Sequence, residues 1–227
     1  SSEPLILVCA TSVGGSNADD VAKEVAIYRA HKATPIVIAS EGEERFAGSP
    51  QRGVELGEKN APATIVEFAD LKCPFCAEFS TSAFNEVVEQ NVRPGEILYE
   101  LRVISFLGKD SGVAAEMAAA AALQNRLYEF VETFYLNQGE ENSGYVTDDF
   151  LRSVATAAGV DAERALAQAN GSFAERRLDR AQAEAGRLGI DSTPTLVVSG
   201  NGRSPQVLDA DPLDPRSVSA ALDGELG

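Results

Sequence analysis

The sequence predicts an α/β protein whose elements follow the order β-α-β, a long helical block, and then β-β-α. Residues 63–68 and 96–105 are rich in β-branched and other apolar residues, and a stretch with helical spacing lies between them. Residues 109–189 have helical spacing almost throughout. After residue 190 two short strand-like runs flank the turn Gly200-Asn201-Gly202, and a helix-forming stretch ends the chain. These three observations define the fold class.

The first β-α-β unit has clear boundaries. The strand at 63–68 is followed by a helix that opens at the cysteine pair, and Arg93-Pro94-Gly95 ends that helix. The second strand alternates apolar residues over 96–105. One helix face carries the apolar residues that we expect in the core, namely Phe79, Ala83, Val87 and Val88.

The helical block has its own start and stop signals. Thr147 precedes two aspartates as an N-cap would, and Gly159 ends that helix. Residues 172–175 read as a capping box, and Gly189 closes the segment that this box opens. One aromatic face recurs at helical spacing, and we expect it to pack against other helices and not to line a ligand pocket: Leu127, Phe130, Val131, Phe134 and Tyr135.

The last part of the chain returns to β structure. Residues 195–199 form a predicted strand, and residues 206–208 its hairpin partner. Asp214 and Pro215 read as the N-cap and first residue of a helix that reaches Leu222.

Three parts of the chain follow from these elements. We expect an N-terminal extension and linker at 1–47, a β-rich domain made of 48–108 and 190–227, and an inserted helical domain at 109–189. The extension reads loosely as strand, helix, strand, or as the remnant of an anchor.

Composition excludes several functions. The formal net charge of −16 argues against a nucleic-acid partner, whose phosphates require a basic surface. His31 is the single histidine, so a site with several histidines is impossible. Cys9 lies in the apolar run of residues 5–10 and is interpreted as a buried, inert thiol. No stretch approaches the roughly 20 apolar residues that cross a bilayer.

The segment Cys73-Pro74-Phe75-Cys76 follows the strand at 63–68 directly. If Cys73 caps the helix and Pro74 occupies its first turn, the Cys73 sulfur faces free backbone amides and the positive end of the helix dipole. Both stabilise a thiolate, and cysteines in such motifs have pKa values of roughly 3.5–7.5. Cys76 lies one turn further along, shielded, and would act second. The motif therefore predicts thiol–disulfide exchange.

Three other readings of the cysteine pair remain open. It could be half of a zinc site, although only Cys9 and His31 remain as further cysteine or histidine ligands, at no recognised spacing. It could be a permanent structural disulfide, which would constrain the unfolded chain very little. It could also be two inert core thiols. The position at a strand–helix junction favours the redox reading.

A second motif agrees with the first. Residues 190–196 place Thr193-Pro194 immediately before a predicted strand. Together with the run from Ala61 to Cys76, this pattern resembles the active-site segment and the cis-proline loop of DsbA-like thiol:disulfide oxidoreductases, with the greatest likeness to bacterial members related to BdbD. The resemblance covers roughly residues 48–227 and implies a thioredoxin fold with an inserted all-helical domain.

The resemblance implies a role for each matching residue. Cys73 is similar to the exposed nucleophile and Cys76 to the buried resolving cysteine. Pro194 would follow a cis peptide bond, and the backbone of Thr193 would pair with the substrate chain, next to Pro74 and Phe75. Glu67 is similar to the acidic residue beneath the disulfide that helps to move protons. The alternative for Glu67 is an ordinary solvent-facing strand residue.

The resemblance also implies a setting. Family members work outside the cytoplasm, where disulfides persist, either free or anchored through a segment that precedes the matched region. Their partners are reduced or unfolded exported proteins and a membrane reoxidant of the DsbB or VKOR type. We expect a monomer that needs no metal and no cofactor other than the Cys73–Cys76 disulfide.

Two departures from the family pattern limit the prediction. Phe75 stands where the most oxidising DsbA proteins carry histidine, and residues 1–45 match no family element. An oxidase is the first expectation, and a reductase or isomerase with the same site is the alternative. A glutathione-dependent transferase and a redox-inactive peptide-binding module on the same scaffold are further alternatives.

Overall fold

The computed structural model describes residues 45–140, 143–200 and 203–226. Within these residues six strands form one sheet in the order β1-β2-β4-β3-β5-β6. Strand β3 runs parallel to β4 and antiparallel to β5, and the remaining neighbours are antiparallel. The strands are β1 (Gln51–Arg52), β2 (Glu55–Leu56), β3 (Ala63–Ala69), β4 (Ile97–Val103), β5 (Thr195–Gly200) and β6 (Arg203–Val207).

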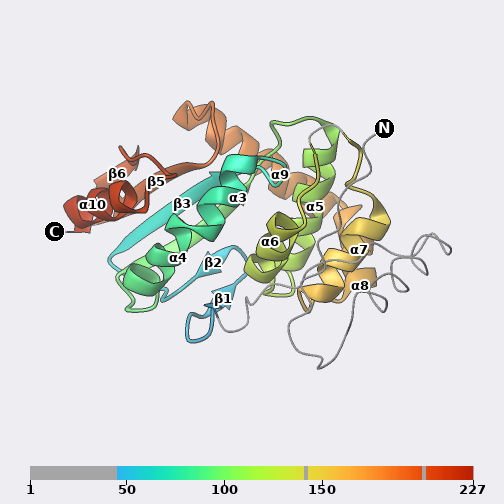
Figure 1. The fold of residues 1–227 in the computed structure, drawn as a ribbon, viewed down its shortest axis with the longest axis horizontal. Helices are drawn as coiled ribbons and strands as arrows, with labels where there is room; N and C mark the ends of the chain where they lie inside the picture. The colour runs from blue at the N-terminus through green and yellow to red at the C-terminus, as the bar shows by residue number, and fades with distance from the viewer. Residues whose placement is uncertain (1–44, 141–142, 201–202, 227) are drawn as a thin grey trace, which may run out of the picture.

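Helices lie on both faces of the sheet (Figure 1). In front of β3 lie α3 (Pro74–Thr81) and α4 (Ala83–Val87), and behind the sheet lies α9 (Ser172–Leu188). The last helix, α10 (Pro215–Leu226), contacts α4. The predicted α/β class, with β-α-β before the helical block and β-β-α after it, is confirmed.

Four further helices and α9 make up the helical block between β4 and β5. They are α5 (Lys109–Ala122), α6 (Leu127–Leu136), α7 (Asp148–Ala157) and α8 (Ala162–Ala169). The predicted aromatic face of α6 is buried throughout and packs inside the main core, as expected. Phe134, for example, meets Phe150 of α7 edge-on at 5.3 Å between ring centroids.

The helix after the cysteine pair is broken, which the sequence reading did not predict. Helix α3 ends at Thr81, α4 follows Ser82, and a π-helical turn η1 (Val88–Val92) completes the segment. Thr81 Oγ1 donates to the carbonyl of Ala77 at 3.1 Å, and Ser82 Oγ donates to that of Glu78 at 2.7 Å. Hydroxyls that bond back to a helical carbonyl bend helices, which accounts for the break.

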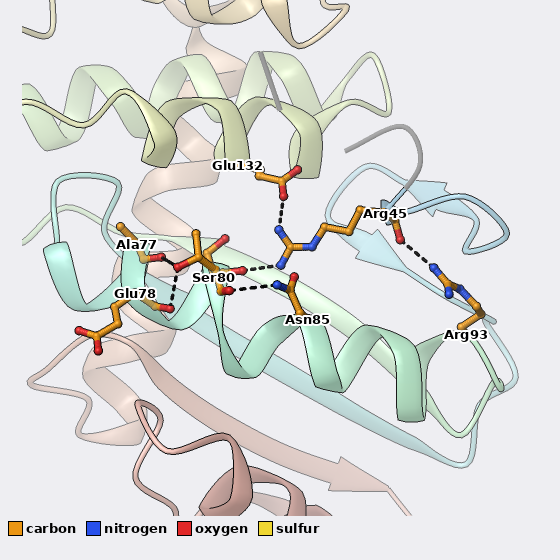
Figure 2. A network of polar contacts seen from close by, with 8 residues as sticks. Arg45, Ala77, Glu78, Ser80, Asn85, Arg93 and Glu132 are labelled. Atoms are coloured by element: carbon orange, nitrogen blue, oxygen red, sulfur yellow. Dashed lines mark hydrogen bonds and ion pairs between the residues drawn. The ribbon is translucent and has the colours of Figure 1, made fainter. Parts of the chain in front are cut away.

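Side chains also satisfy the carbonyls that the break leaves free (Figure 2). Asn85 Nδ2 donates to the carbonyl of Thr81 at 3.0 Å. The Arg45 guanidinium donates to the carbonyl of Ser80 and pairs with Glu132 of α6. Arg45 therefore ties the end of α3 to the helical block.

Helix boundaries agree with the sequence signals in most places. Thr147 caps α7 by accepting from the amide of Phe150 at 3.2 Å, and Gly189 takes the left-handed conformation after α9 at φ 70°. The capping box at 172–175 is wrong: Gly171 is the N-cap of α9, and Ser172 is already helical. Because Ser172 lies one position too far along, its hydroxyl cannot cap the helix.

Two C-terminal elements differ slightly from expectation. Helix α10 begins at Pro215, with Asp214 Oδ1 accepting from the amide of Arg216 at 3.0 Å, but it continues to Leu226 beyond the predicted end. Strand β6 covers residues 203–207, so it begins three residues and ends one residue earlier than predicted. The interpretations of residues 1–44, including Cys9 and His31, lie outside the described residues, and the proposed domain boundaries stay predictions.

Candidate active site

Cys73 lies at the N-cap position of α3, and Pro74 is the first residue of the helix. Proline has no amide hydrogen to leave unpaired there, and its fixed φ suits the first turn. The Cys73 side chain accepts no capping hydrogen bond, but the backbone amides of Phe75 and Cys76 help to lower its pKa. The predicted N-cap position of Cys73 and first-turn position of Pro74 are confirmed.

The pKa values of the two cysteines are shifted in opposite directions, that of Cys73 down and that of Cys76 up. A hydrogen bond from the Cys76 side chain is the largest cause that lowers the pKa of Cys73, to about 6. Burial opposes this shift, and the Thr193 side chain and the two helix amides add to it. Burial raises the pKa of Cys76 well above its ordinary value. At neutral pH Cys73 is therefore mainly a thiolate and Cys76 a thiol.

Accessibility also differs within the motif. Cys73 is 5% exposed and Cys76 is fully buried. Cys73, which we expected to be exposed, therefore has only a small solvent-accessible surface. Phe75, between them, is 54% exposed. A large apolar ring in solvent beside a reactive sulfur is a surface on which a partner can pack.

The cis-proline loop faces the cysteine pair. The Thr193–Pro194 peptide bond is cis, as the resemblance implied. The Cys73 thiol donates to the carbonyl of Thr193 at 3.3 Å, which joins two segments 120 residues apart. A groove of about 410 Å³ runs from Phe75 along this loop to the segment after β6; its lining includes Ser192, Thr195, Leu196, Val207, Leu208 and Leu213.

Glu67 lies beneath the cysteines, in the interior. It is 5% exposed, so the solvent-facing alternative is wrong. Burial raises its pKa to about 7, although a hydrogen bond of 2.7 Å from the Tyr99 hydroxyl opposes the shift. The Cys73 charge raises the Glu67 pKa further, which shows that the two groups interact electrostatically. A carboxyl group that titrates near neutrality can both give and take protons.

The sequence analysis did not predict a role for two charged residues of the loop before Cys73. Asp70 is fully buried, and its carboxylate accepts from the amides of Lys72, Phe106 and Leu107 at 2.7 to 3.0 Å. Lys72 Nζ donates to the carbonyl of Leu107 at 3.0 Å. Together they fix the loop that carries Cys73 to the loop after β4. An aspartate at a strand end was the available sequence signal.

Helix α6 also holds this loop. Gln138, just after α6, donates from Nε2 to the carbonyls of Leu71 and Cys73 at 2.8 and 3.2 Å. No local pattern predicts a contact that spans more than 60 residues. The helical block therefore positions the backbone on which the reactive sulfur sits.

Within the described residues, no group of three or more histidine, cysteine, aspartate or glutamate side chains is arranged to hold a metal ion. In the same residues no helix is long and apolar enough to cross a membrane.

Comparison with known proteins agrees with this geometry. The family model described as Thioredoxin matches residues 49–223. The probable disulfide bond formation protein D of Bacillus cereus is 28% identical over 189 residues, which cover 82% of this chain and 83% of that protein.

Two solved structures share the fold. BdbD from Bacillus subtilis, in its oxidised form, matches with a TM-score of 0.68 and 20% identity, over 85% of this chain and 99% of that one. Alpha-DsbA1 from Wolbachia pipientis matches with a TM-score of 0.64 and 18% identity, over 77% of this chain and 90% of that one. Both likenesses concern the fold, a thioredoxin fold with helices inserted between its two halves.

Proposed function

This chain belongs to the thioredoxin family, and on that premise we propose that it is a thiol:disulfide oxidoreductase that transfers the Cys73–Cys76 disulfide to reduced proteins. The observation that carries the proposal is the position of Cys73 at the N-cap of α3, against the carbonyl of the cis Thr193–Pro194 bond, with Cys76 buried one turn further along. The opposite pKa shifts of the two cysteines agree with it. One sulfur is ready to leave or attack as a thiolate, and the other is shielded until the first has reacted.

The exchange takes two steps. A substrate thiolate attacks Cys73 Sγ of the disulfide, the S–S bond breaks, and Cys76 takes up a proton as its thiol re-forms. A second substrate thiolate then attacks the substrate sulfur of the mixed disulfide, and Cys73 leaves as a stabilised thiolate. The substrate dithiol loses two electrons and becomes a disulfide, and the protein gains them as two reduced cysteines.

Glu67 supplies the proton that the first step needs. Its carboxyl group is buried close to the cysteine pair and titrates near pH 7, so its protonated form can give a proton to the departing Cys76 thiolate. When the reaction runs in reverse, the same carboxylate can take the proton back.

The low pKa of Cys73 favours donation of the disulfide. A stabilised thiolate makes the reduced protein more stable, and this makes the disulfide a stronger oxidant. Phe75 offers the sulfur no side-chain hydrogen bond, so this stabilisation comes from the helix amides, Thr193 and Cys76.

We further propose how the substrate is held and where the protein works. An extended segment pairs with the backbone at Thr193, beside Pro194 and Pro74, while an apolar side chain packs on Phe75 and in the groove beside it. The substrates are reduced exported proteins outside the cytoplasm, and a membrane protein of the DsbB or VKOR type restores the disulfide. Disulfides persist in that compartment.

The test is oxidation of a reduced, unfolded protein by the purified disulfide form. Cys73→Ser should reduce the activity to background. Cys76→Ser cannot carry the disulfide and should also lose the activity, but its Cys73 thiolate should form a trapped mixed disulfide with a protein that already contains a disulfide. Cys9→Ser, which changes the third cysteine in the chain, should leave the rate unchanged. Full activity of Cys73→Ser would refute the proposal.

The redox potential separates an oxidase from a reductase. We expect a value less negative than roughly −200 mV in equilibrium with glutathione. A value near −270 mV, which is about that of thioredoxin, would instead indicate a reductase with the same site.

A further inference from the structure

A second cavity lies on the other side of the sheet from α3. It has a volume of about 440 Å³ and is formed by β4, α5 and α9, with residues of the β1–β2 turn and of α6 at its edge. This volume is within the range of roughly 300–1,000 Å³ that is usual for small-molecule sites. The disulfide chemistry proposed above makes no use of it.

The side chains that line the cavity are either apolar or charged, and all the charged ones except Glu184 are arginines. The apolar residues are Val54, Leu101, Val103, Ala115, Ala118, Ala119, Ala122, Leu127, Phe173, Leu178 and Ala181. The polar residues are Arg102, Arg176, Arg177, Arg180 and Glu184. Among the described residues no side-chain amide or hydroxyl lines the cavity, so these side chains do not match the alternating donors and acceptors of a peptide.

The arginines are short of acceptors. Arg102 pairs with Glu100 and Glu184 at 2.5 and 3.3 Å, yet its Nη1 is buried without a hydrogen-bond partner. Arg177 is half-buried and has no acceptor among the described residues. Burial and the neighbouring charges of Arg102 and Arg180 lower its pKa, and the nearby Glu100 carboxylate opposes this shift. The four arginines of the lining outnumber the two neighbouring carboxylates, Glu100 and Glu184, so the cavity has an excess of positive charge.

We propose that this cavity binds an amphiphilic anion, a linear hydrocarbon chain that ends in a carboxylate. The chain lies on the alanine and leucine side chains, and the carboxylate accepts hydrogen bonds from Arg177 and from Arg102 Nη1. Arginine suits a carboxylate because its planar guanidinium donates two parallel hydrogen bonds. The concentration of arginine in one cavity of a chain with net charge −16 fits an anionic ligand. This inference does not depend on the proposed redox function.

The test is calorimetric titration of the full chain with monomeric sodium dodecanoate. We expect saturable binding at one site per chain. Arg177→Gln should weaken this binding about tenfold or more, since a hydrogen bond to a charged group is lost. Arg187→Gln is the matched control, because Arg187 is exposed on the same helix and does not line the cavity. It should bind dodecanoate as the parent does.

Two further titrations distinguish the ligand chemistry. Dodecanol, which has the chain without the charge, should bind at least about tenfold more weakly than dodecanoate. Dodecanoate binding should be the same in Cys73→Ser, so that loss of disulfide exchange does not affect the result. Equal affinity of Arg177→Gln and Arg187→Gln would overturn the proposal. So would binding to vesicles of anionic phospholipid, or to an acidic peptide, without binding of monomeric dodecanoate.

Discussion

The free backbone amides at the N-terminal end of helix α3 and the free carbonyls at its C-terminal end have different partners. At the N-terminal end, the amides of Phe75 and Cys76 have no carbonyl partner within the helix, and they add to the Cys76 side-chain hydrogen bond that lowers the pKa of Cys73. At the C-terminal end, side chains satisfy the free carbonyls of Ser80 and Thr81. The arrangement at the N-terminal end keeps Cys73 reactive as a thiolate. The contacts at the C-terminal end fix the position of the helix.

This difference separates the effects of substitution. The groups near the N-terminal end, Cys73 and Glu67, change charge between about pH 6 and 7, so substitutions there should change how the protein depends on pH. The Arg45 contacts at the other end involve neither of these two groups. Substitutions there should change stability without changing the pH profile of Cys73 alkylation.

The largest expected effect concerns Glu67→Gln. Below about pH 4.5 the carboxyl group is protonated in both states and contributes nothing. As pH rises towards 7 the unfolded chain loses this proton first, so the folded parent protein loses stability, on the order of 3 kcal/mol in total. Glutamine cannot ionise. The stability difference between Glu67→Gln and the parent should therefore grow by this amount between acidic and mildly alkaline pH.

Denaturant unfolding of both reduced proteins across this range provides the measurement. Both proteins should carry Cys73→Ser, because Cys73 and Glu67 interact electrostatically and the Cys73 titration would otherwise not cancel between them. A difference that stays constant with pH would mean that Glu67 has an ordinary pKa.

The next effect lies at the opposite end of the helix. Arg45→Met removes the hydrogen bond to Ser80 and leaves Glu132, whose side chain is 10% exposed, without its cation. We expect unfolding free energy to fall by about 2 kcal/mol, with no change in the pH profile of Cys73 alkylation. Arg93→Met is the control, since Arg93 donates to the Arg45 carbonyl from a more exposed position, and it should cost less than about 1 kcal/mol. A shifted Cys73 profile in Arg45→Met would show that the two ends are coupled.

A smaller effect is expected from Tyr99→Phe. The Tyr99 hydroxyl donates to Glu67 Oε2 at 2.7 Å and so lowers the Glu67 pKa. Without it the Glu67 pKa should rise by about one unit, because a hydrogen bond to a charged group is lost. The pH-dependent part of the unfolding free energy should therefore move to higher pH. If Tyr99→Phe and the parent show the same transition, the hydroxyl does not tune Glu67.

The smallest effect is expected from Thr193→Ala. The Thr193 side chain is one of several groups that lower the Cys73 pKa, and the carbonyl of residue 193 remains in the variant. We expect the Cys73 pKa to rise by less than about one unit, as for the loss of one of several hydrogen bonds. Alkylation of Cys73 as a function of pH measures it. A rise all the way to the ordinary thiol value would mean that the helix amides contribute little.

The local part of the site could be predicted from sequence. A β-rich run followed by Cys73-Pro74 places a sulfur at a helix N-terminus, and Thr193-Pro194 before a strand marks the facing loop. Both depend on neighbouring residues, for which turn and capping rules are reliable.

The parts that were missed depend on distant residues or on small displacements. Gln138 reaches the carbonyls of Leu71 and Cys73 from the end of α6, more than 60 residues away in sequence, and no local rule links them. The break at Ser82 needs Arg45 and two hydroxyls to satisfy the carbonyls together. The capping box failed because its pattern was displaced by a single residue from the real N-cap, Gly171.

The pKa of Cys73 tests the central claim most directly. The reduced protein should be alkylated, and should show thiolate absorbance in the ultraviolet, with a midpoint near pH 6. Cys73→Ser should lose this transition and Cys9→Ser should keep it. A midpoint near the ordinary thiol pKa of about 8.5 would contradict the account, because Cys76, Thr193 and the helix amides would then not stabilise the thiolate.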